Sequence, residues 1–241
     1  MSIYRVTITG ADDNTPISEL RKLTDEFEFV EWGILIGTQK QLSRFPSLDW
    51  IYELVEERGR KGARMWLSLH VCGQPLRDIA AGNSPFQREL NFLFTAFDRV
   101  QLNWHGERQG NISENILKAF CNSCPEWDPQ IIFQNDGVNT NDIWQPCSRR
   151  FICSYLFDQS HGAGVVPDEW PQCSNELTCG YAGGLGPHNL STELPKIFVA
   201  NKYNTDIWID AETHVRTNNV LDMDKVRRFL EIAKPHIKAS A

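Results

Sequence analysis

Short apolar runs rich in β-branched and aromatic residues recur eight times along this chain, and helix-patterned segments separate most of them. Runs of this length and composition predict buried β-strands. The eight runs are residues 4–10, 29–37, 64–73, 99–106, 130–136, 151–158, 179–184 and 205–212. Strands that alternate with helices pair in parallel through right-handed crossovers. Eight such units in 241 residues predict a single α/β domain over residues 1–241, a (β/α)8 TIM barrel.

A doubly wound open sheet is the alternative arrangement for the same alternation. The count of eight favours the barrel, and no Gly-x-Gly-x-x-Gly motif follows the first predicted strand. Helical periodicity is found in residues 16–27, 47–62, 113–122 and 222–237. The least regular region is 121–150, which we interpret as an elaboration around a short fifth strand.

The charge balance restricts the classes of partner. The formal net charge is −7 and the pI is about 5.4, whereas binding to nucleic acid or to an anionic membrane surface favours a basic face. No apolar run approaches the roughly 20 residues of a membrane helix, and the first ten residues lack the pattern of a signal peptide. We therefore expect a soluble, cytoplasmic protein with a small-molecule ligand, and neither nucleic acid nor membrane as a partner.

The seven cysteines do not form a recognisable metal or disulfide pattern. An odd number of cysteines in a chain expected to be cytosolic argues against a disulfide framework. Cys121 and Cys124 form a C-x-x-C pair, but Cys147 and Cys153 are too widely spaced to complete a four-ligand zinc site. We expect ordinary thiols, with no metal and no cofactor.

Polar side chains lie near the ends of several predicted strands, where a barrel of this class places its active site. They are Thr9, His70, Asn103, Asp158, Asp210 and Glu212. Convergence of such groups predicts one pocket at the C-terminal mouth of the barrel. Taken singly, an aspartate at a strand end also caps the next turn, and a lone histidine is also a structural group. Asp158 differs because Gly162 and Gly164 follow it, and small residues allow a ligand to approach closely.

The stretch CGYAGGLGPHN, residues 179–189, follows the seventh predicted strand and precedes a helix-forming segment. A glycine loop at a helix N-terminus binds anions because free N–H groups and the helix dipole both favour negative charge. Barrels commonly bind phosphate at the loops after strands 7 and 8. The alternative is a tight turn that needs positive φ at Gly183, Gly184 or Gly186. The position in the barrel favours the anion site.

Seven short motifs occur in a specific order along the whole chain. They read VTITG, WGILIGTQKQLSRFPS, LSLHVCGQPLRDI, VQLNWHGER, YLFDQSHGAGVVPDEW, AGGLGPHN and DIWIDAETHVRTNNVLDMDKVRRFLEIA. In these motifs the chain resembles the phosphoribosylanthranilate isomerase family of tryptophan biosynthesis, (β/α)8 enzymes that perform an Amadori rearrangement. The resemblance implies that Asp158 is the general acid and that Arg44 faces the anthranilate carboxylate. It also implies that Gly183 and Gly184 donate to the phosphate and that Asp210 lies near the sugar and amine.

The chain departs from the family at functional positions. Thr9 stands where the family has its general-base cysteine, and a hydroxyl has no useful basicity near neutral pH. The family's Ser-Ser-Gly segment, which cradles the phosphate, is replaced by Glu212, Thr213 and His214. A carboxylate at that place repels a dianion. Arg216 replaces a family glutamate, and we expect it to offset Glu212.

Three functions remain open from the sequence. The first is a diverged isomerase that acts on a ribosyl or phosphoribosyl compound. Its predicted catalytic residues are Asp158 as the acid, Asp210 as its partner, and Thr9. We expect the family's canonical turnover to be impaired. The second is a binding protein that sequesters or senses a phosphoribosyl or nucleotide-like ligand. Loss of the cysteine favours the binder, and retention of both aspartates favours the enzyme. Glycoside hydrolysis by carboxylates is a third function. The expected ligand-binding residues are Arg44, His70, Asn103, Gly162, Gly164, Gly183, Gly184, Glu212 and Thr213.

Substitutes for the missing base are present in the sequence near the Thr9 position. They are Cys72, Asp12 and Asp13, of which the two aspartates lie beyond the end of the first strand.

Overall fold

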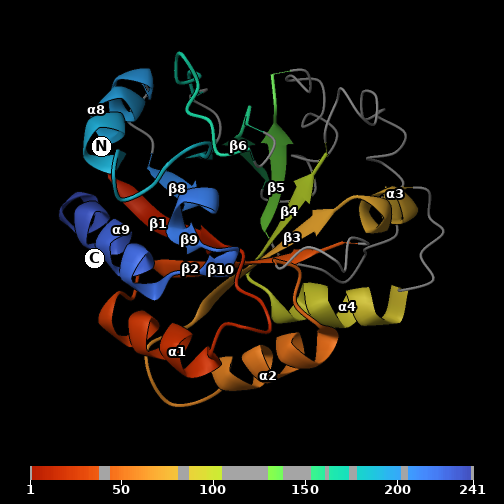
Figure 1. Ribbon diagram of the computed structural model, residues 1–241. Coiled ribbons are helices and arrows are strands. Elements are labelled where there is room, and N and C mark those ends of the chain that lie inside the picture. The colour runs from red at the N-terminus through yellow and green to blue at the C-terminus, as the bar shows by residue number, and fades with distance from the viewer. Residues whose placement is uncertain are drawn as a thin grey trace.

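Eight parallel strands close into a barrel, which confirms the predicted fold and excludes the open sheet (Figure 1). The structure, a computed structural model, describes residues 2–37, 44–80, 87–104, 130–137, 153–160, 163–173, 178–201 and 206–239. The barrel strands are β1 (Ile3–Thr9), β2 (Val30–Ile36), β3 (Trp66–Cys72), β4 (Arg99–Asn103), β5 (Gln130–Asn135), β6 (Cys153–Phe157), β7 (Thr178–Tyr181) and β8 (Ile207–Ala211). Each lies within one of the eight runs predicted from the sequence, give or take one or two residues.

Helices pack around the outside of the barrel (Figure 1). They are α1 (Ile17–Glu26), α2 (Leu48–Arg58), α3 (Gln74–Ala80), α4 (Gln87–Ala96), α8 (Leu190–Ala200) and α9 (Met223–Ala233). Helix α9 begins where the Asp222 carboxylate accepts hydrogen bonds from the backbone N–H groups of Asp224 and Lys225, and α2 begins at the Ser47 cap. The predicted helix at 113–122 lies outside the described residues, as do all but 130–137 of the region 121–150.

After β8 the chain forms two short 3-10 turns and a small hairpin. The turns are η2 (Thr213–Val215) and η3 (Lys234–His236), and the hairpin strands are β9 (Arg216–Thr217) and β10 (Val220–Leu221). None of the described helices is both long and apolar enough to cross a membrane.

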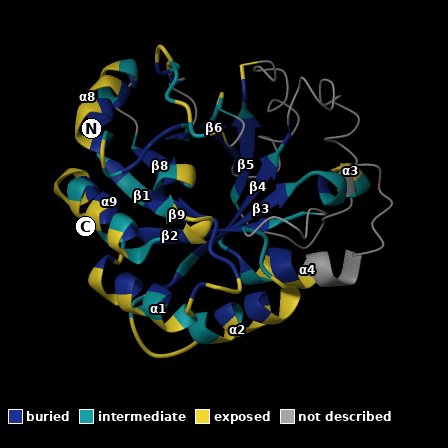
Figure 2. Cartoon of the chain, viewed as in Figure 1, coloured by how far each residue is buried: buried dark blue, intermediate teal, exposed yellow. Residues whose placement is uncertain are grey.

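The main hydrophobic core lies between the sheet and the helices, where Figure 2 shows buried residues on the strands and on the inner helix faces. Helices contribute one buried stripe each, such as Val226, Phe229 and Leu230 of α9. The barrel interior holds a smaller apolar cluster of Ile132, Leu156, Ala182 and Trp208. The rest of the interior is largely polar.

An ion pair between Glu31 and Arg99 lies at the centre of this polar interior. The Arg99 Nε donates to Glu31 Oε2 at 2.8 Å and a second guanidinium nitrogen contacts Oε1. The Glu31 carboxylate also accepts from Thr7 Oγ1 at 2.8 Å, and Arg99 lies over the Trp208 ring, 4.5 Å from its centroid. Both charges are thus paired and hydrogen-bonded, which a buried charge requires.

One expectation is wrong: a disulfide joins Cys173 and Cys179. The chain after β6 turns back onto β7, because the Trp170 ring packs edge-on against Tyr181 and the Tyr181 hydroxyl donates to Pro171 O at 3.1 Å. That packing brings Cys173 beside the strand that carries Cys179. The number and spacing of cysteines could not reveal this return of the chain. Cys72 and Cys153 are described as thiols outside this disulfide, and Cys121, Cys124 and Cys147 lie outside the described residues.

From the buried ion pair between Glu31 and Arg99 we predict how the loss of one partner changes the stability of the protein. Arg99→Met should lower the free energy of unfolding by about 3–5 kcal/mol, since it leaves the Glu31 charge buried and unpaired. The matched control is Arg60→Met, because the Arg60 side chain is 71% exposed in its ion pair with Glu57 and should matter by less than about 1 kcal/mol. Urea unfolding measures both. Equal effects of the two substitutions would contradict the role of the buried pair.

Candidate functional site

A cavity open to solvent lies at the C-terminal mouth of the barrel, and the space in and in front of it, open solvent included, is about 450 Å³. Its lining comes from the ends of strands on both sides of the barrel and from the loops after β6, β7 and β8. The lining residues are Thr9, His70, Gln101, Asn103, Leu156, Asp158, Ser160, Gly164, Ala182, Gly183, Gly184, Leu185, Asp210, Ala211, Glu212, Thr213 and His214. The structure thus brings together nearly all the site residues predicted from the sequence. Gly162 lies outside the described residues.

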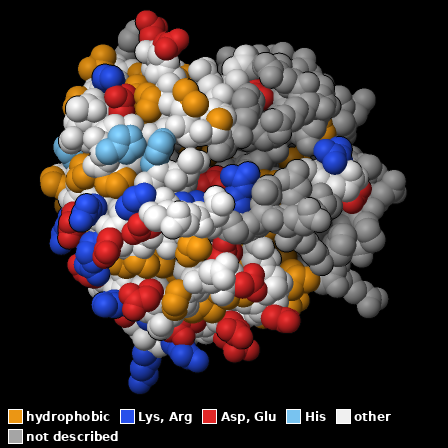
Figure 3. All heavy atoms as spheres, in the orientation of Figure 1, with side chains coloured by type: hydrophobic (Ala, Val, Ile, Leu, Met, Phe, Trp, Pro, Cys, Tyr) orange, Lys and Arg blue, Asp and Glu red, His pale blue; other side chains and the backbone are white. Residues whose placement is uncertain are grey.

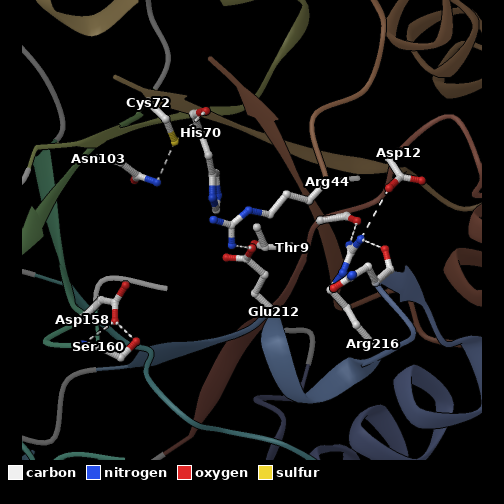
Figure 4. Close-up of polar contacts among 12 residues, drawn as sticks. Thr9, Asp12, Arg44, His70, Cys72, Asn103, Asp158, Ser160, Glu212 and Arg216 are labelled. Atoms are coloured by element: carbon white, nitrogen blue, oxygen red, sulfur yellow. Dashed lines mark hydrogen bonds and ion pairs between the residues drawn. The ribbon is translucent and has the colours of Figure 1, made fainter. Parts of the chain in front are cut away.

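Asp158 follows β6 and is held by three donors. Its Oδ1 accepts from the backbone N–H of Ser160 at 3.0 Å and from the Ser160 hydroxyl at 2.7 Å (Figure 4). Its Oδ2 accepts from Gln134 Nε2 of β5 at 3.1 Å. These contacts fix the carboxyl group at the cavity wall, so its position does not depend on a ligand.

Asp210 of β8 lies deeper in the barrel, with 6% of its surface exposed. Thr9 Oγ1 of β1 donates to Asp210 Oδ1 at 2.8 Å. Burial raises the pKa of Asp210 well above its ordinary value, and the nearby carboxylates Glu212, Asp158 and Glu31 raise this pKa further. The Thr9 hydroxyl opposes the rise. Thr9 therefore acts on the site as a hydrogen-bond partner of Asp210.

Glu212 is paired with Arg44. The Arg44 guanidinium donates to Glu212 Oε1 at 2.7 Å, joining the loop after β2 to the loop after β8 (Figure 4). Burial raises the pKa of Glu212, although the Arg44 charge opposes the rise. The Arg216 charge opposes the rise as well, as expected, although its hydrogen bonds go to the carbonyl oxygens of Gly10 and Asn219 and it pairs with Asp12 at 3.4 Å. Arg44 is the direct partner of Glu212 and makes the larger contribution.

Cys72 of β3 does not replace the missing base. Burial raises the pKa of the Cys72 thiol to about 12, so the thiolate is scarce at neutral pH. Asn103 Nδ2 approaches its sulfur at 3.2 Å. Asp12 and Asp13 also lie away from the cavity lining, since Asp12 pairs with Arg216 and Asp13 accepts from Ser47.

The glycine loop after β7 adopts the left-handed backbone that glycine permits, with φ of 107° at Gly183 and 66° at Gly184. A Cβ at Gly184 would collide with the backbone of Val166 in the loop after β6. Neither Gly183 nor Gly184 donates its backbone N–H to a group in the described part of the chain. The turn interpretation and the anion-site interpretation are thus compatible, because the turn leaves two donors unpaired beside the cavity.

Two histidines border the same loop. The His188 and His214 rings lie edge to face, 4.8 Å between centroids, and His214 Nε2 donates to Gly164 O at 2.8 Å. Figure 3 shows histidine side chains gathered on the face that it presents. His214 therefore ties together the loops after β6, β7 and β8.

The electrostatic character of the cavity is acidic. Three carboxyl groups, those of Asp158, Asp210 and Glu212, line it, and of the described lysines and arginines none lines it directly. Arg44 contacts the cavity lining through its ion pair with Glu212. In the described ranges, no three His, Cys, Asp or Glu side chains are grouped so that they could hold a metal ion.

Gln101 and Gln134 are polar residues of predicted strands that were expected to converge on the pocket, but neither was predicted as a ligand-binding or catalytic residue, and Ser160 was not predicted at all. Gln101 and Gln134 lie on inward-facing positions of β4 and β5, and both are about 4% exposed. A glutamine inside an apolar strand run was the available signal, because such a side chain needs a buried partner.

From the raised pKa of Asp210 we predict how the stability of the protein depends on pH. A group whose pKa is raised by folding favours the folded state at low pH, and this contribution is lost as the pH rises towards the raised value. Asp210→Asn should therefore be more stable than wild type at pH 7.5, and the gain should disappear near pH 3. Each tenfold change in acid dissociation constant corresponds to about 1.4 kcal/mol. Thermal unfolding across pH measures this, with the exposed Asp168→Asn as control, and a gain independent of pH would contradict it.

Comparisons with known proteins bear on the fold. No family model and no curated protein matches the chain. Among solved structures, the chain is similar to TrpF from Jonesia denitrificans, with a TM-score of 0.59 and 13% identity over 96% of this chain and 97% of that one. It is also similar to N-(5'-phosphoribosyl)anthranilate isomerase from Pyrococcus furiosus, with a TM-score of 0.56 and 15% identity over 96% and 99%. The chain shares the (β/α)8 fold of these isomerases.

Proposed function

We propose that this protein is an acid–base isomerase that converts an aldose-type ribosyl or phosphoribosyl compound into the corresponding ketose form. The observation that carries the proposal is the presence of two carboxyl groups from different strands, Asp158 and Asp210, in one cavity that also presents unpaired backbone donors. Two carboxyl groups can divide the roles of acid and base, and the family resemblance assigns the acid role to Asp158, which leaves the role of base to Asp210. Asp158 lies in a polar, hydrogen-bonded setting and Asp210 in a buried one.

The reaction needs one proton delivered to the ring oxygen and one proton removed from C2. For an N-ribosyl amine, Asp158 donates a proton to the ring oxygen as the C1–O bond breaks, and the nitrogen lone pair forms an imine. Asp210 then removes the proton on C2, and the C–H electrons form the C1–C2 double bond of an enol amine. Tautomerisation of this enol gives the ketone. The Ser160 hydroxyl beside Asp158 can reverse its hydrogen bond, so it supports Asp158 in either protonation state.

Asp210 compensates for the missing cysteine. A carboxylate is a weak base at its ordinary pKa, and catalysis by a base improves as its pKa approaches the working pH. The raised pKa of Asp210 moves it in that direction. The hydrogen bond from Thr9 supports this role, because the hydroxyl orients the carboxyl group to which we assign the proton transfer.

The ligand's charged end is expected at the glycine loop. Gly183 and Gly184 offer backbone N–H groups to a phosphate. Glu212 is the unfavourable neighbour, and its pairing with Arg44 reduces the repulsion. The same pairing occupies Arg44, so a ring carboxylate such as that of anthranilate has to compete with Glu212. We therefore expect slow turnover of phosphoribosylanthranilate compared with an N-ribosyl compound that lacks this carboxylate.

A second candidate function is ligand binding without turnover, for sequestration or sensing of a phosphoribosyl or nucleotide-like compound. It is favoured by Thr9 at the position of the family's base and by the occupied Arg44. A binder raises its melting temperature with these compounds and leaves them chemically unchanged.

Exchange of the C2 proton with solvent tests the isomerase. In D2O the protein should introduce deuterium at C2 of phosphoribosylanthranilate or D-ribose 5-phosphate, followed by NMR. Asp158→Asn and Asp210→Asn should each slow ketose formation at least about 100-fold. Asp168→Asn, an exposed aspartate on the loop that follows Asp158, is the matched control and should change little. Undiminished exchange in Asp210→Asn would remove it as the base, and binding without exchange in wild type would favour the binder.

From the position of Glu212 in the cavity lining we predict how its charge affects the affinity for phosphate. Glu212→Ser removes a negative charge from the lining and frees Arg44, so inorganic phosphate should bind about fivefold more tightly or better, as expected for one charge at roughly 4 Å in water. Calorimetric titration measures this. Glu169→Ser, which changes an exposed glutamate on the loop after β6, should leave phosphate affinity unchanged. Weaker phosphate binding by Glu212→Ser would contradict the expected phosphate position.

A further inference from the structure

His70 of β3 carries a buried ring nitrogen that has no partner. The residue is 2% exposed and lines the cavity, and its Nε2 makes no hydrogen bond to any described residue. Nearly all buried polar atoms in proteins are hydrogen-bonded. An unpaired one at a cavity wall marks a place where a ligand supplies the missing partner.

The position of the His70 proton follows from a chain of amide groups. Asn103 Nδ2 donates to Cys72 Sγ at 3.2 Å, which leaves Asn103 Oδ1 to accept from Gln101 Nε2 at 2.8 Å (Figure 4 shows the first contact). The same Gln101 Nε2 lies 3.3 Å from His70 Nδ1. An amide nitrogen is only a donor, so Nδ1 is the acceptor and the ring proton of neutral His70 is on Nε2.

His70 remains neutral at physiological pH. Burial lowers its pKa to about 3, and the positive charge of Arg99 in the layer below contributes in the same direction. No carboxylate among the described residues forms an ion pair or hydrogen bond with the imidazole. His70 is therefore a neutral donor and provides no charge for a phosphate.

The free edge of the ring lies next to the proposed base. A Cβ on Gly33 of β2 would be 2.9 Å from His70 Cε1 and 3.1 Å from Nε2, and it would collide with Thr9 Oγ1. The free edge of His70 and the Thr9 hydroxyl thus approach each other across Gly33, and Thr9 in turn bonds Asp210. A ligand atom that reaches Asp210 comes close to His70 as well.

We propose that His70 Nε2–H donates a hydrogen bond to a hydroxyl or carbonyl oxygen of the ligand beside Asp210, so that the deep end of the cavity takes an uncharged, sugar-like group. The acidic lining supports this, because Asp158 and Asp210 accept from sugar hydroxyls while His70 supplies the complementary donor. The inference rests on the proposed function in one respect, namely that a ribosyl ligand enters this cavity.

The first test reads the tautomer without any ligand. Two-dimensional ¹⁵N–¹H NMR of histidine rings in the full-length protein should show a neutral Nε2–H imidazole whose signals do not change between pH 5.5 and 8, and His70→Phe should remove these signals. A neutral Nδ1–H tautomer or an imidazolium in this range would overturn the inference. This measurement is made on wild type, so it stands even where a variant fails to fold.

The second test measures binding of D-ribose, with inorganic phosphate as the comparison probe. His70→Phe should weaken D-ribose binding about tenfold, the effect of one neutral hydrogen bond, and His70→Gln should recover part of the loss. Phosphate affinity should be unchanged in both variants. Equal D-ribose affinity in wild type and His70→Phe overturns this inference alone. Absence of D-ribose binding in wild type overturns it together with the proposed ribosyl site.

Discussion

The buried ion pair between Glu31 and Arg99 is the interaction on which the site depends. It lies within the barrel, where an unpaired charge would cost several kcal/mol, and it forms the floor beneath the cavity. Its charges also act on the layer above. Arg99 helps to keep His70 neutral, and Glu31 adds to the negative field that raises the pKa of Asp210. The polar interior of this barrel therefore contributes to its packing and also shifts the pKa values of His70 and Asp210 above it.

Above this floor lie Asp158 and Asp210, the two aspartates to which the proposed function assigns the roles of acid and base. Thr9, at the position of the family's base, donates a hydrogen bond to Asp210. Glu212 pairs with the Arg44 guanidinium, which the family resemblance assigns to a substrate carboxylate. Under the proposed function, the change at Thr9 makes Asp210 the base and the pairing of Glu212 withdraws Arg44 from direct contact with a ligand. On that basis we propose that the deep part of the ligand is neutral.

Much of the fold and of the candidate site could be predicted from the sequence, because buried strands appear in it as apolar runs. All eight strands and the convergence of Asp158 and Asp210 follow from apolar runs that end in polar residues. Pairings between distant loops left no such pattern. Arg44 with Glu212, and Cys173 with Cys179, depend on how loops return over the barrel, which local periodicity does not encode. The proton on His70 likewise depends on three amide and thiol neighbours that only the assembled strands bring together.

A crystal structure of the protein with D-ribose 5-phosphate tests the account most directly. We predict that the sugar lies between Asp158 and Asp210, with an oxygen within hydrogen-bond distance of His70 Nε2. We also predict that the phosphate accepts hydrogen bonds from the backbone N–H groups of Gly183 and Gly184. A cavity that stays empty at saturating ligand, or a phosphate bound away from the glycine loop with the sugar outside the barrel mouth, would contradict it.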